Sequence, residues 1–179
     1  MSGSIIVEHR RVIVERFGES ILNEAVASLT AVQRQEFEEI RPATWIHIST
    51  VEAFYVALAR GLQRTVADLH TEVGRLAVER TLKSYWRVFL RFTSDEALIT
   101  RSPVIFTKTF DRGRVVATIS RPGQGQATLL DWPNAGEFVV RGLRNGIATL
   151  LTVAGRTNVS ARITTRTPDQ VVIAVTWDV

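Results

Sequence analysis

The sequence contains no cysteine among its 179 residues and only three histidines. Without a thiol, the chain can form neither a disulfide framework nor a zinc-thiolate site nor a cysteine nucleophile. The histidines, His9, His47 and His70, do not have the spacing of metal ligands, so we expect no metal site. No apolar run approaches the about 20 residues that a membrane span needs, and the first residues do not resemble a signal peptide. We therefore expect a cytoplasmic protein without a membrane span.

Lysine is also scarce, so the net charge of +4 comes almost entirely from arginine. A long helix predicted over residues 66–92 has one basic side, and acidic residues beside it can pair with these cations. A solvated helix surface explains this side better than a nucleic-acid interface, so we expect no nucleic-acid partner. The basic side carries Arg80, Lys83, Arg87 and Arg91.

The clearest pattern in the chain lies near its carboxyl end. Residues 159–164 and 171–178 alternate apolar and polar side chains with a period of two, which is typical of a half-buried antiparallel hairpin. Thr167-Pro168-Asp169 between them favours a turn. A similar pattern predicts an earlier hairpin over 114–120 and 126–132. We predict an α+β fold in which these hairpins form a four-stranded antiparallel sheet.

Between the hairpins the period changes to about 3.6, which predicts a helix that enters at Pro133 with Asn134 as its cap. Gly155 is expected to end it in the left-handed region. Gly142 and Gly146 lie inside this helix, where each glycine costs up to about 1 kcal/mol relative to alanine. Tight packing of the helix on the sheet is one explanation. The other is a wall kept thin for a ligand.

Residues 1–112 are expected to be mainly helical, and 113–179 to form the hairpin, helix, hairpin part of a single domain. Ser49 with Glu52 forms a capping-box pattern at the start of one helix. Ser94 is the expected cap of a later helix, and Pro103 is expected to interrupt it before the sheet begins. The other helices are predicted over residues 5–17, 19–29, 33–40 and 66–92.

No motif for a nucleophile, a phosphate or a dinucleotide is present, so we expect no enzyme activity and no cofactor. What the sequence does accumulate is aromatic residues. Burial in the core is their default role, but a helical layer over a curved sheet can also enclose an apolar cavity. Tyr55, Arg141 or Arg162 could anchor a polar group of the ligand. The residues expected to line this site are Trp45, Phe54, Tyr55, Trp86, Phe89, Phe138, Gly142 and Gly146.

The chain resembles the superfamily of haem-nitric-oxide-binding domains, vinyl-reductase-type domains and palmitate-binding subunits of the TRAPP tethering complex. The resemblance rests on residues 12–19 (VIVERFGE), on Arg101-Ser102-Pro103 before the sheet, and on the hairpin, helix, hairpin order that ends near Trp177. Ala43-Thr44-Trp45-Ile46 and the helix around Gly74 look like a family of uncharacterised proteins found largely in myxobacteria. The resemblance implies a scaffold that encloses an apolar ligand or pairs with another protein.

The chemistry of the individual branches does not carry over. The haem branch uses a proximal histidine and a Tyr-x-Ser-x-Arg motif, but Tyr55 is followed by Val-Ala-Leu-Ala and Tyr85 by Trp-Arg-Val-Phe. The other two branches use cysteines that this sequence lacks. The leading hypothesis is therefore a non-enzymatic sensor or adaptor that buries a small apolar molecule between helices and sheet. The alternative is a ligand-free interaction module, acting as a homodimer or as a subunit of a signalling complex.

Overall fold

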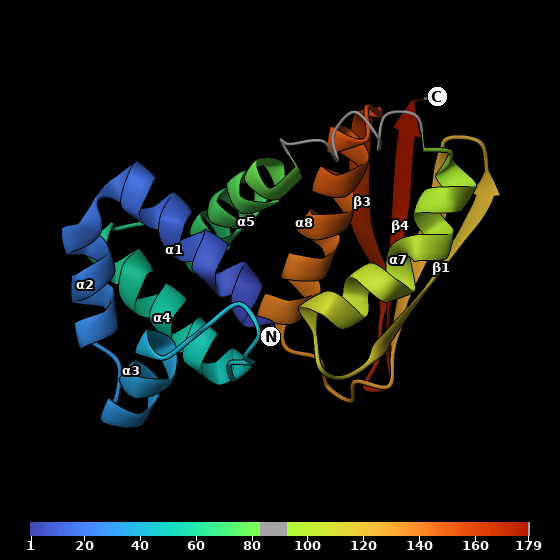
Figure 1. Cartoon of the computed structure of the whole chain (residues 1–179). Coiled ribbons are helices and arrows are strands. Elements are labelled where there is room, and N and C mark those ends of the chain that lie inside the picture. The colour runs from blue at the N-terminus through green and yellow to red at the C-terminus, as the bar shows by residue number, and fades with distance from the viewer. Residues whose placement is uncertain (83–92, 179) are drawn as a thin grey trace. The chain divides into compact units, whose positions relative to one another are not determined.

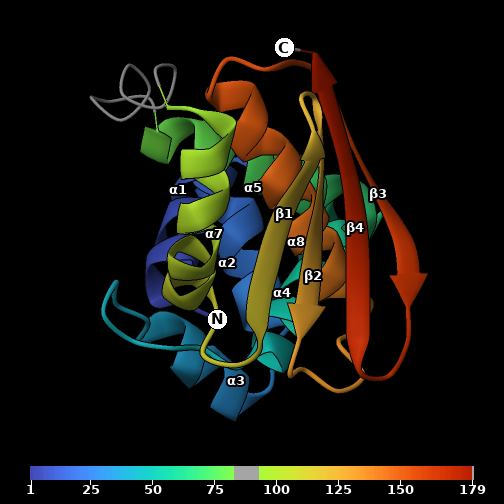
Figure 2. The ribbon, with the colours of Figure 1, turned by 90° about the vertical axis from the view of Figure 1, so that its right-hand side faces the viewer.

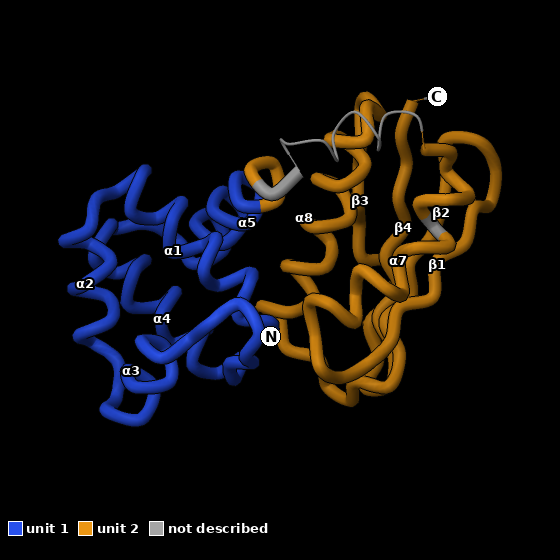
Figure 3. Tube along the Cα trace, in the orientation of Figure 1, with its two compact units in different colours: residues 1–77 blue, residues 78–179 orange. Residues whose placement is uncertain are grey.

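The computed structural model describes residues 1–82 and 93–178. Contacts within the chain group it into two compact units, Met1–Ala77 and Val78–Val179, and Figure 3 colours them separately. Each unit is described by itself. Lys83, Arg87 and Arg91 of the predicted basic side lie outside the described residues.

The first unit consists of helices (Figure 1). Large side chains such as Ile13, Phe37 and Leu58 are fully buried and form its core. Gly18 separates the first two helices with a positive φ of 93°, which confirms the predicted stop there. The helices are α1 (Gly3–Phe17), α2 (Glu19–Ala27), α3 (Ala31–Glu38), α4 (Ile48–Gly61) and α5 (Val66–Leu82), the last of which continues into the second unit.

The start of α4 differs from the prediction of a Ser49 capping box, which was wrong. The helix begins at Ile48 after His47, whose side chain makes no cap. Glu36 of α3 takes over this role, because its carboxylate accepts the backbone N–H of His47 at 2.7 Å and the hydroxyl of Thr50. A carboxylate at a helix amino terminus satisfies unpaired N–H groups and complements the helix dipole.

The second unit contains the four-stranded antiparallel sheet that the alternating patterns predicted. Its order is β1-β2-β4-β3, so the two hairpins meet through β2 and β4. In β4 the side chains of Val171, Ile173, Val175 and Trp177 are buried as expected, while Thr176 between them is exposed. The strands are β1 (Arg114–Arg121), β2 (Gln124–Leu130), β3 (Thr157–Arg166) and β4 (Gln170–Asp178).

Two helices, α7 (Asp95–Thr109) and α8 (Glu137–Val153), lie on one face of this sheet (Figure 2). Ser94 caps α7 by accepting the N–H of Ala97, as predicted. The expected break at Pro103 was wrong, since this proline lies inside α7. Figure 1 shows a bend in the helix, as is usual where proline removes a backbone donor. Leu98 and Phe106, buried on either side of the proline, hold both halves against the unit.

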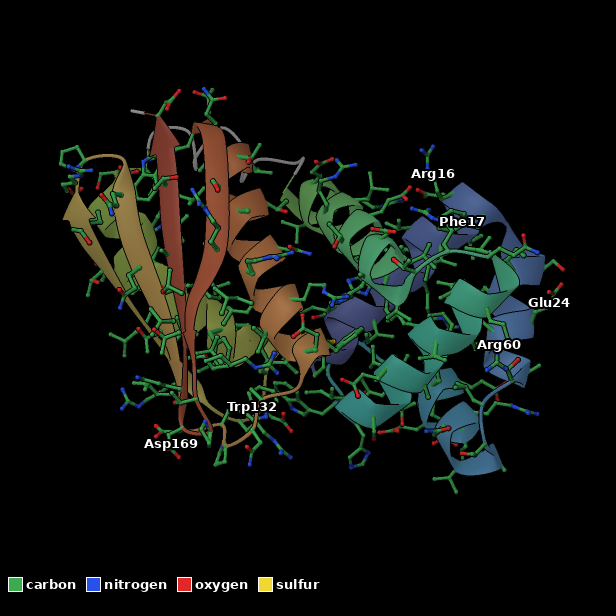
Figure 4. The ribbon with its side chains drawn as sticks, turned by 180° about the vertical axis from the view of Figure 1, so that it is seen from behind. Arg16, Phe17, Glu24, Arg60, Trp132 and Asp169 are labelled. Atoms are coloured by element: carbon green, nitrogen blue, oxygen red, sulfur yellow. The ribbon has the colours of Figure 1, made fainter. Side chains whose placement is uncertain are left out.

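Helix α8 begins later than the Pro133 and Asn134 pattern indicated. Gly136 is its N-cap, and Asn134 has a left-handed φ of 53° that excludes it from a helix. The backbone N–H of Asn134 donates to the carbonyl of Pro168 at 2.9 Å, which ties this segment to the β3–β4 turn. Figure 4 shows Trp132 and Asp169 at that end of the sheet. Gly155, with φ 90°, follows the end of α8 as predicted.

A buried ion pair joins the start of α7 to the segment after α8. Arg156 donates from Nε and Nη2 to Oδ1 of Asp95 at 2.9 and 2.6 Å, and the two side chains are only 13% and 18% exposed. The same guanidinium donates to the carbonyls of Thr93 and Ala154. Trp177 donates its indole N–H to the other oxygen of Asp95 at 3.1 Å. The network connects both helices with the end of β4.

Candidate functional site

The residues predicted to line a ligand site are distributed over both units. Trp86 and Phe89 lie outside the described residues. Among the others the structure finds deeply buried aromatics, one half-exposed tryptophan and two half-buried glycines. Phe54, Tyr55 and Trp45 belong to the first unit, and Phe138, Gly142 and Gly146 to the second.

A polar cluster occupies the interior of the first unit, where α1, α4 and α5 meet. Tyr55, which is fully buried, shares a hydrogen bond of 2.9 Å between its hydroxyl and Nδ1 of His9. The ring of His70 packs edge-on against both, with centroids 5.1 Å from Tyr55 and 6.3 Å from His9. Both histidines are buried. Sequence spacing did not reveal this cluster, because its members come from three helices.

Burial determines the protonation of this cluster. Removal from water, together with the smaller effect of the neighbouring His70, lowers the pKa of His9 to about 3. Burial also raises the pKa of the Tyr55 hydroxyl well above its usual range. Both groups are therefore neutral at neutral pH. A neutral phenol and a neutral imidazole form a stable buried hydrogen bond but offer no charge for chemistry.

Phe54 and Trp45 have different surroundings in the same unit. The ring of Phe54 stacks on Phe37 with centroids 4.4 Å apart and meets Tyr55 edge-on, so its contacts are those of a core residue. Trp45 is 47% exposed, and its backbone forms an isolated β-bridge with Ser2. The backbone on either side of Trp45 is also tied to the first residues, since Gly3 donates to the carbonyl of Thr44.

Glu36 on α3 has a structural role. Its carboxylate also contacts Nδ1 of His47 at 2.6 Å. Burial would raise the pKa of Glu36, but the hydrogen bonds from Thr50 and His47 outweigh burial and hold it below its ordinary value. Glu36 and His47 lie on either side of the loop between two helices, so local spacing gave no signal for their contact.

The face of α8 that carries Gly146 is mostly buried. Val139, Thr149 and Val153 lie three or seven residues from Gly146, so they project from the same side of the helix, and all three are buried. A Cβ atom built on Gly146 would nevertheless have no atom of the described residues within 4 Å. Tight packing of the helix therefore does not explain this glycine, and the structure has open space beside a half-buried position.

The suggested polar anchors for a ligand already have partners or lie at the surface. The hydroxyl of Tyr55 is bonded to His9, and Arg141 donates to Glu137 on the same helix at 3.0 Å. Arg162 is exposed on β3. An open surface recess of about 600 Å³ lies between the β1–β2 turn and the end of β4, where residues 121–124 and 176–178 line it. None of the predicted ligand residues that the structure describes lines this recess.

The comparisons with known proteins support the fold. No protein-family model and no curated protein matches the sequence. Solved structures do match over nearly the whole chain. An oxygen-binding H-NOX domain related to soluble guanylate cyclases, in its oxygen complex, matches with a TM-score of 0.74 and 13% identity, over 99% of this chain and 95% of that one. The Fe(II) unliganded H-NOX protein from K. algicida matches with a TM-score of 0.74 and 10% identity, over 99% and 97%.

The chain has the H-NOX fold. This confirms, at the level of the fold, the resemblance to the superfamily of haem-nitric-oxide-binding domains. A further H-NOX structure, from work on the function of haem distortion, matches with a TM-score of 0.73 and 12% identity, over 99% of this chain and 95% of that one. At such low identity the likeness establishes architecture, and the chemistry must come from this chain's own residues.

The residues of this chain do not fit a histidine-ligated haem. Nδ1 of His9 is bonded to Tyr55, and its ring is enclosed with that of His70 in the helical core. The side chain of His47 is 84% exposed and its Nδ1 faces Glu36. The sequence has no histidine beyond His70 and no Tyr-x-Ser-x-Arg motif for the propionates. The H-NOX fold is thus present without the Tyr-x-Ser-x-Arg motif.

Proposed function

We propose that this chain is a non-enzymatic sensor or adaptor domain with the H-NOX fold, which takes up a small apolar molecule beside Gly146 on α8. The observation that carries the proposal is the open space next to this glycine on a helix face where Val139, Thr149 and Val153 are buried. Glycine inside a helix costs about 1 kcal/mol relative to alanine, and among residues 1–82 and 93–178 no neighbouring atom requires it here. A ligand bound in this space would explain why position 146 has no side chain.

The chemistry of the surrounding face favours an apolar ligand. Val139, Val153 and Leu150 supply hydrocarbon, and Leu150 packs against the small apolar cluster formed with Leu98. The polar member of the face, Thr149, donates its hydroxyl to the carbonyl of Asn145 at 2.8 Å. A ligand here would gain free energy chiefly from burial of its apolar surface.

Several features support binding in preference to catalysis. The buried groups His9 and Tyr55 are neutral, the buried charges of Asp95 and Arg156 are paired with each other, and Glu137 is held by arginines. None of the helices in the described residues combines the length and apolar content needed to cross a bilayer. The sequence contains no cysteine and therefore no disulfide that an oxidising compartment would maintain, which supports a location in the cytoplasm.

The test compares Gly146→Leu with Gly61→Leu. Both glycines are helical and have no atom within 4 Å of the Cβ position, but Gly61 is exposed at the end of α4. Native mass spectrometry and solvent extraction would detect a co-purifying apolar molecule, and titration with an environment-sensitive apolar dye would measure uptake. We expect Gly146→Leu to reduce uptake about tenfold, which corresponds to about 1.4 kcal/mol, and Gly61→Leu to leave it unchanged.

Circular dichroism and thermal melts of both variants would show that the fold is intact. Equal dye uptake by the wild type and Gly146→Leu would refute a ligand site on this face. Loss of uptake in both variants would mean that the dye reports general surface hydrophobicity, and the proposal would fail as well.

A further inference from the structure

Helix α7 has one buried side and one side that faces solvent. Its buried side is formed by Leu98 and Phe106, followed by Phe110 just after the helix, and the rings of Phe106 and Phe110 lie 5.1 Å apart. Phe110 in turn meets Trp132 edge-on at 5.4 Å. These contacts hold α7 against the sheet of the second unit. The other side of the helix faces solvent.

The solvent side of α7 contains a stripe of two aliphatic residues flanked by two cations. Arg101, Val104, Ile105 and Lys108 follow the spacing i, i+3, i+4 and i+7, which places them on one side of a helix. All four are exposed, and Val104 and Ile105 expose 59% and 43% of their surface. We call these four residues the α7 stripe.

Stability of the isolated chain does not account for the aliphatic pair. β-Branched residues are weaker helix formers than alanine, lysine or glutamate, and a large part of each side chain, 59% of Val104 and 43% of Ile105, stays in solvent. Single exposed apolar residues are normal on protein surfaces, but adjacent ones on one helix face with charged flanks are typical of contact surfaces. Among the described residues, Val104 and Ile105 are the one consecutive pair of large hydrophobics that is exposed.

The charges of the stripe indicate the chemistry of the partner. Arg101 and Lys108 stand about 10 Å apart along the axis, since each residue of a helix rises about 1.5 Å. In the part of the chain that the structure describes, neither cation has an ion pair, and the stripe carries no acidic residue. A helix with two carboxylates one heptad apart and leucine-like residues between them would complement both features.

We infer that the α7 stripe is a docking surface for an acidic amphipathic helix of another protein. The aliphatic pair supplies the buried centre of the contact, and the two cations set the orientation and accelerate the encounter. A contact centred on four side chains belongs to the small, transient class of interfaces. This inference does not depend on the ligand proposed beside Gly146.

The test uses a fluorescent synthetic helix with two central leucines between glutamates one heptad apart, and a twin with lysines in place of the glutamates. Fluorescence anisotropy would measure binding of both peptides to the full chain. We expect the acidic peptide to bind and the basic twin not to bind. Arg101→Gln with Lys108→Gln should weaken binding of the acidic peptide about tenfold, and so should Val104→Gln with Ile105→Gln.

A matched control lies outside helix α7. Arg60 at the end of α4 and Arg121 at the end of β1 are exposed, and their double replacement by glutamine lowers the net charge from +4 to +2, as does the double replacement of Arg101 and Lys108 by glutamine. This control variant should bind the acidic peptide within about twofold of wild type. Thermal melts would confirm that all variants fold.

Three outcomes would overturn the inference. Equal weakening by the control and the arginine–lysine variant would show that net charge alone attracts the peptide. Stripe-dependent binding to vesicles of anionic phospholipid, without binding to the peptide, would assign the surface to a membrane. Concentration-dependent dimers that disappear in the Val104 and Ile105 variant would assign it to a second copy of this chain.

Discussion

The hydroxyl of Tyr55 and Nδ1 of His9 are 2.9 Å apart in the interior of the helical unit, although 46 residues separate them in the chain. Folding places an imidazole where it cannot take up a proton until the pKa of about 3 is reached, whereas in the unfolded chain His9 titrates near 6.5. The unfolded state therefore binds an additional proton between these pH values. Stability contributed by neutral His9 is present above pH 6.5 and is lost as the pH falls.

This difference predicts acid sensitivity in a window where carboxylates are still mostly ionised. Between pH 6.5 and pH 5 the free energy of unfolding should fall by about 2 kcal/mol, at about 1.4 kcal/mol per pH unit. Urea titrations at several pH values would measure it. His9→Gln, which keeps a polar partner for Tyr55, should flatten the dependence. The exposed His47→Gln should not, and an unchanged slope in His9→Gln would show that another group is responsible.

The ion pair between Asp95 and Arg156 should be costly to break from one side. Asp95→Asn would leave a guanidinium with little solvent, so we expect a loss of about 3 kcal/mol in the free energy of unfolding. Arg114 and Asp131 form a comparison pair at 2.6 Å, but their side chains are 57% and 65% exposed. Asp131→Asn should cost less than about 1 kcal/mol. Equal losses in chemical denaturation would contradict the role assigned to burial.

The environments of two glycines predict opposite effects of alanine. At Gly146 the added methyl group meets nothing within 4 Å, so Gly146→Ala should raise the free energy of unfolding of ligand-free protein by up to about 1 kcal/mol. At Gly125 the methyl group would lie 2.9 Å from the carbonyl oxygen of Thr118 and 3.3 Å from the ring of Trp177. Gly125→Ala should therefore destabilise by about 1 to 3 kcal/mol. Thermal and urea unfolding of both variants would measure the two effects, and a loss at Gly146 would show that its space is needed empty.

Features governed by neighbouring residues could be read from the sequence. The strict alternation in β4 predicted which side chains are buried, because successive residues of a strand point to opposite faces. The Ser94 cap and the Gly155 stop were also correct, since each acts within one helical turn. Local patterns failed at Ser49 and Pro103, where contacts from elsewhere in the fold outweighed them.

The candidate site was harder to predict than the fold. Tyr55 was selected as a possible anchor, but His9 and His70 were regarded as isolated, because their proximity depends on how three helices pack. The bond between Glu36 and His47 was missed for the same reason. The sequence drew attention to the glycines of α8, but only coordinates show that open space, not a close neighbour, lies beside Gly146.

The amino-acid sequence was sufficient for the α+β class, the four antiparallel strands and the absence of thiol chemistry. Periodicity depends on residues close together in the chain, and composition does not depend on structure. The packing of helices decided which polar groups are buried, which charges are paired and which apolar residues stay in solvent. Those properties depend on distances between residues far apart in the chain, as between His9 and Tyr55 or Asp95 and Arg156. Local propensity carries no information on such distances, whereas burial and pKa follow directly from them.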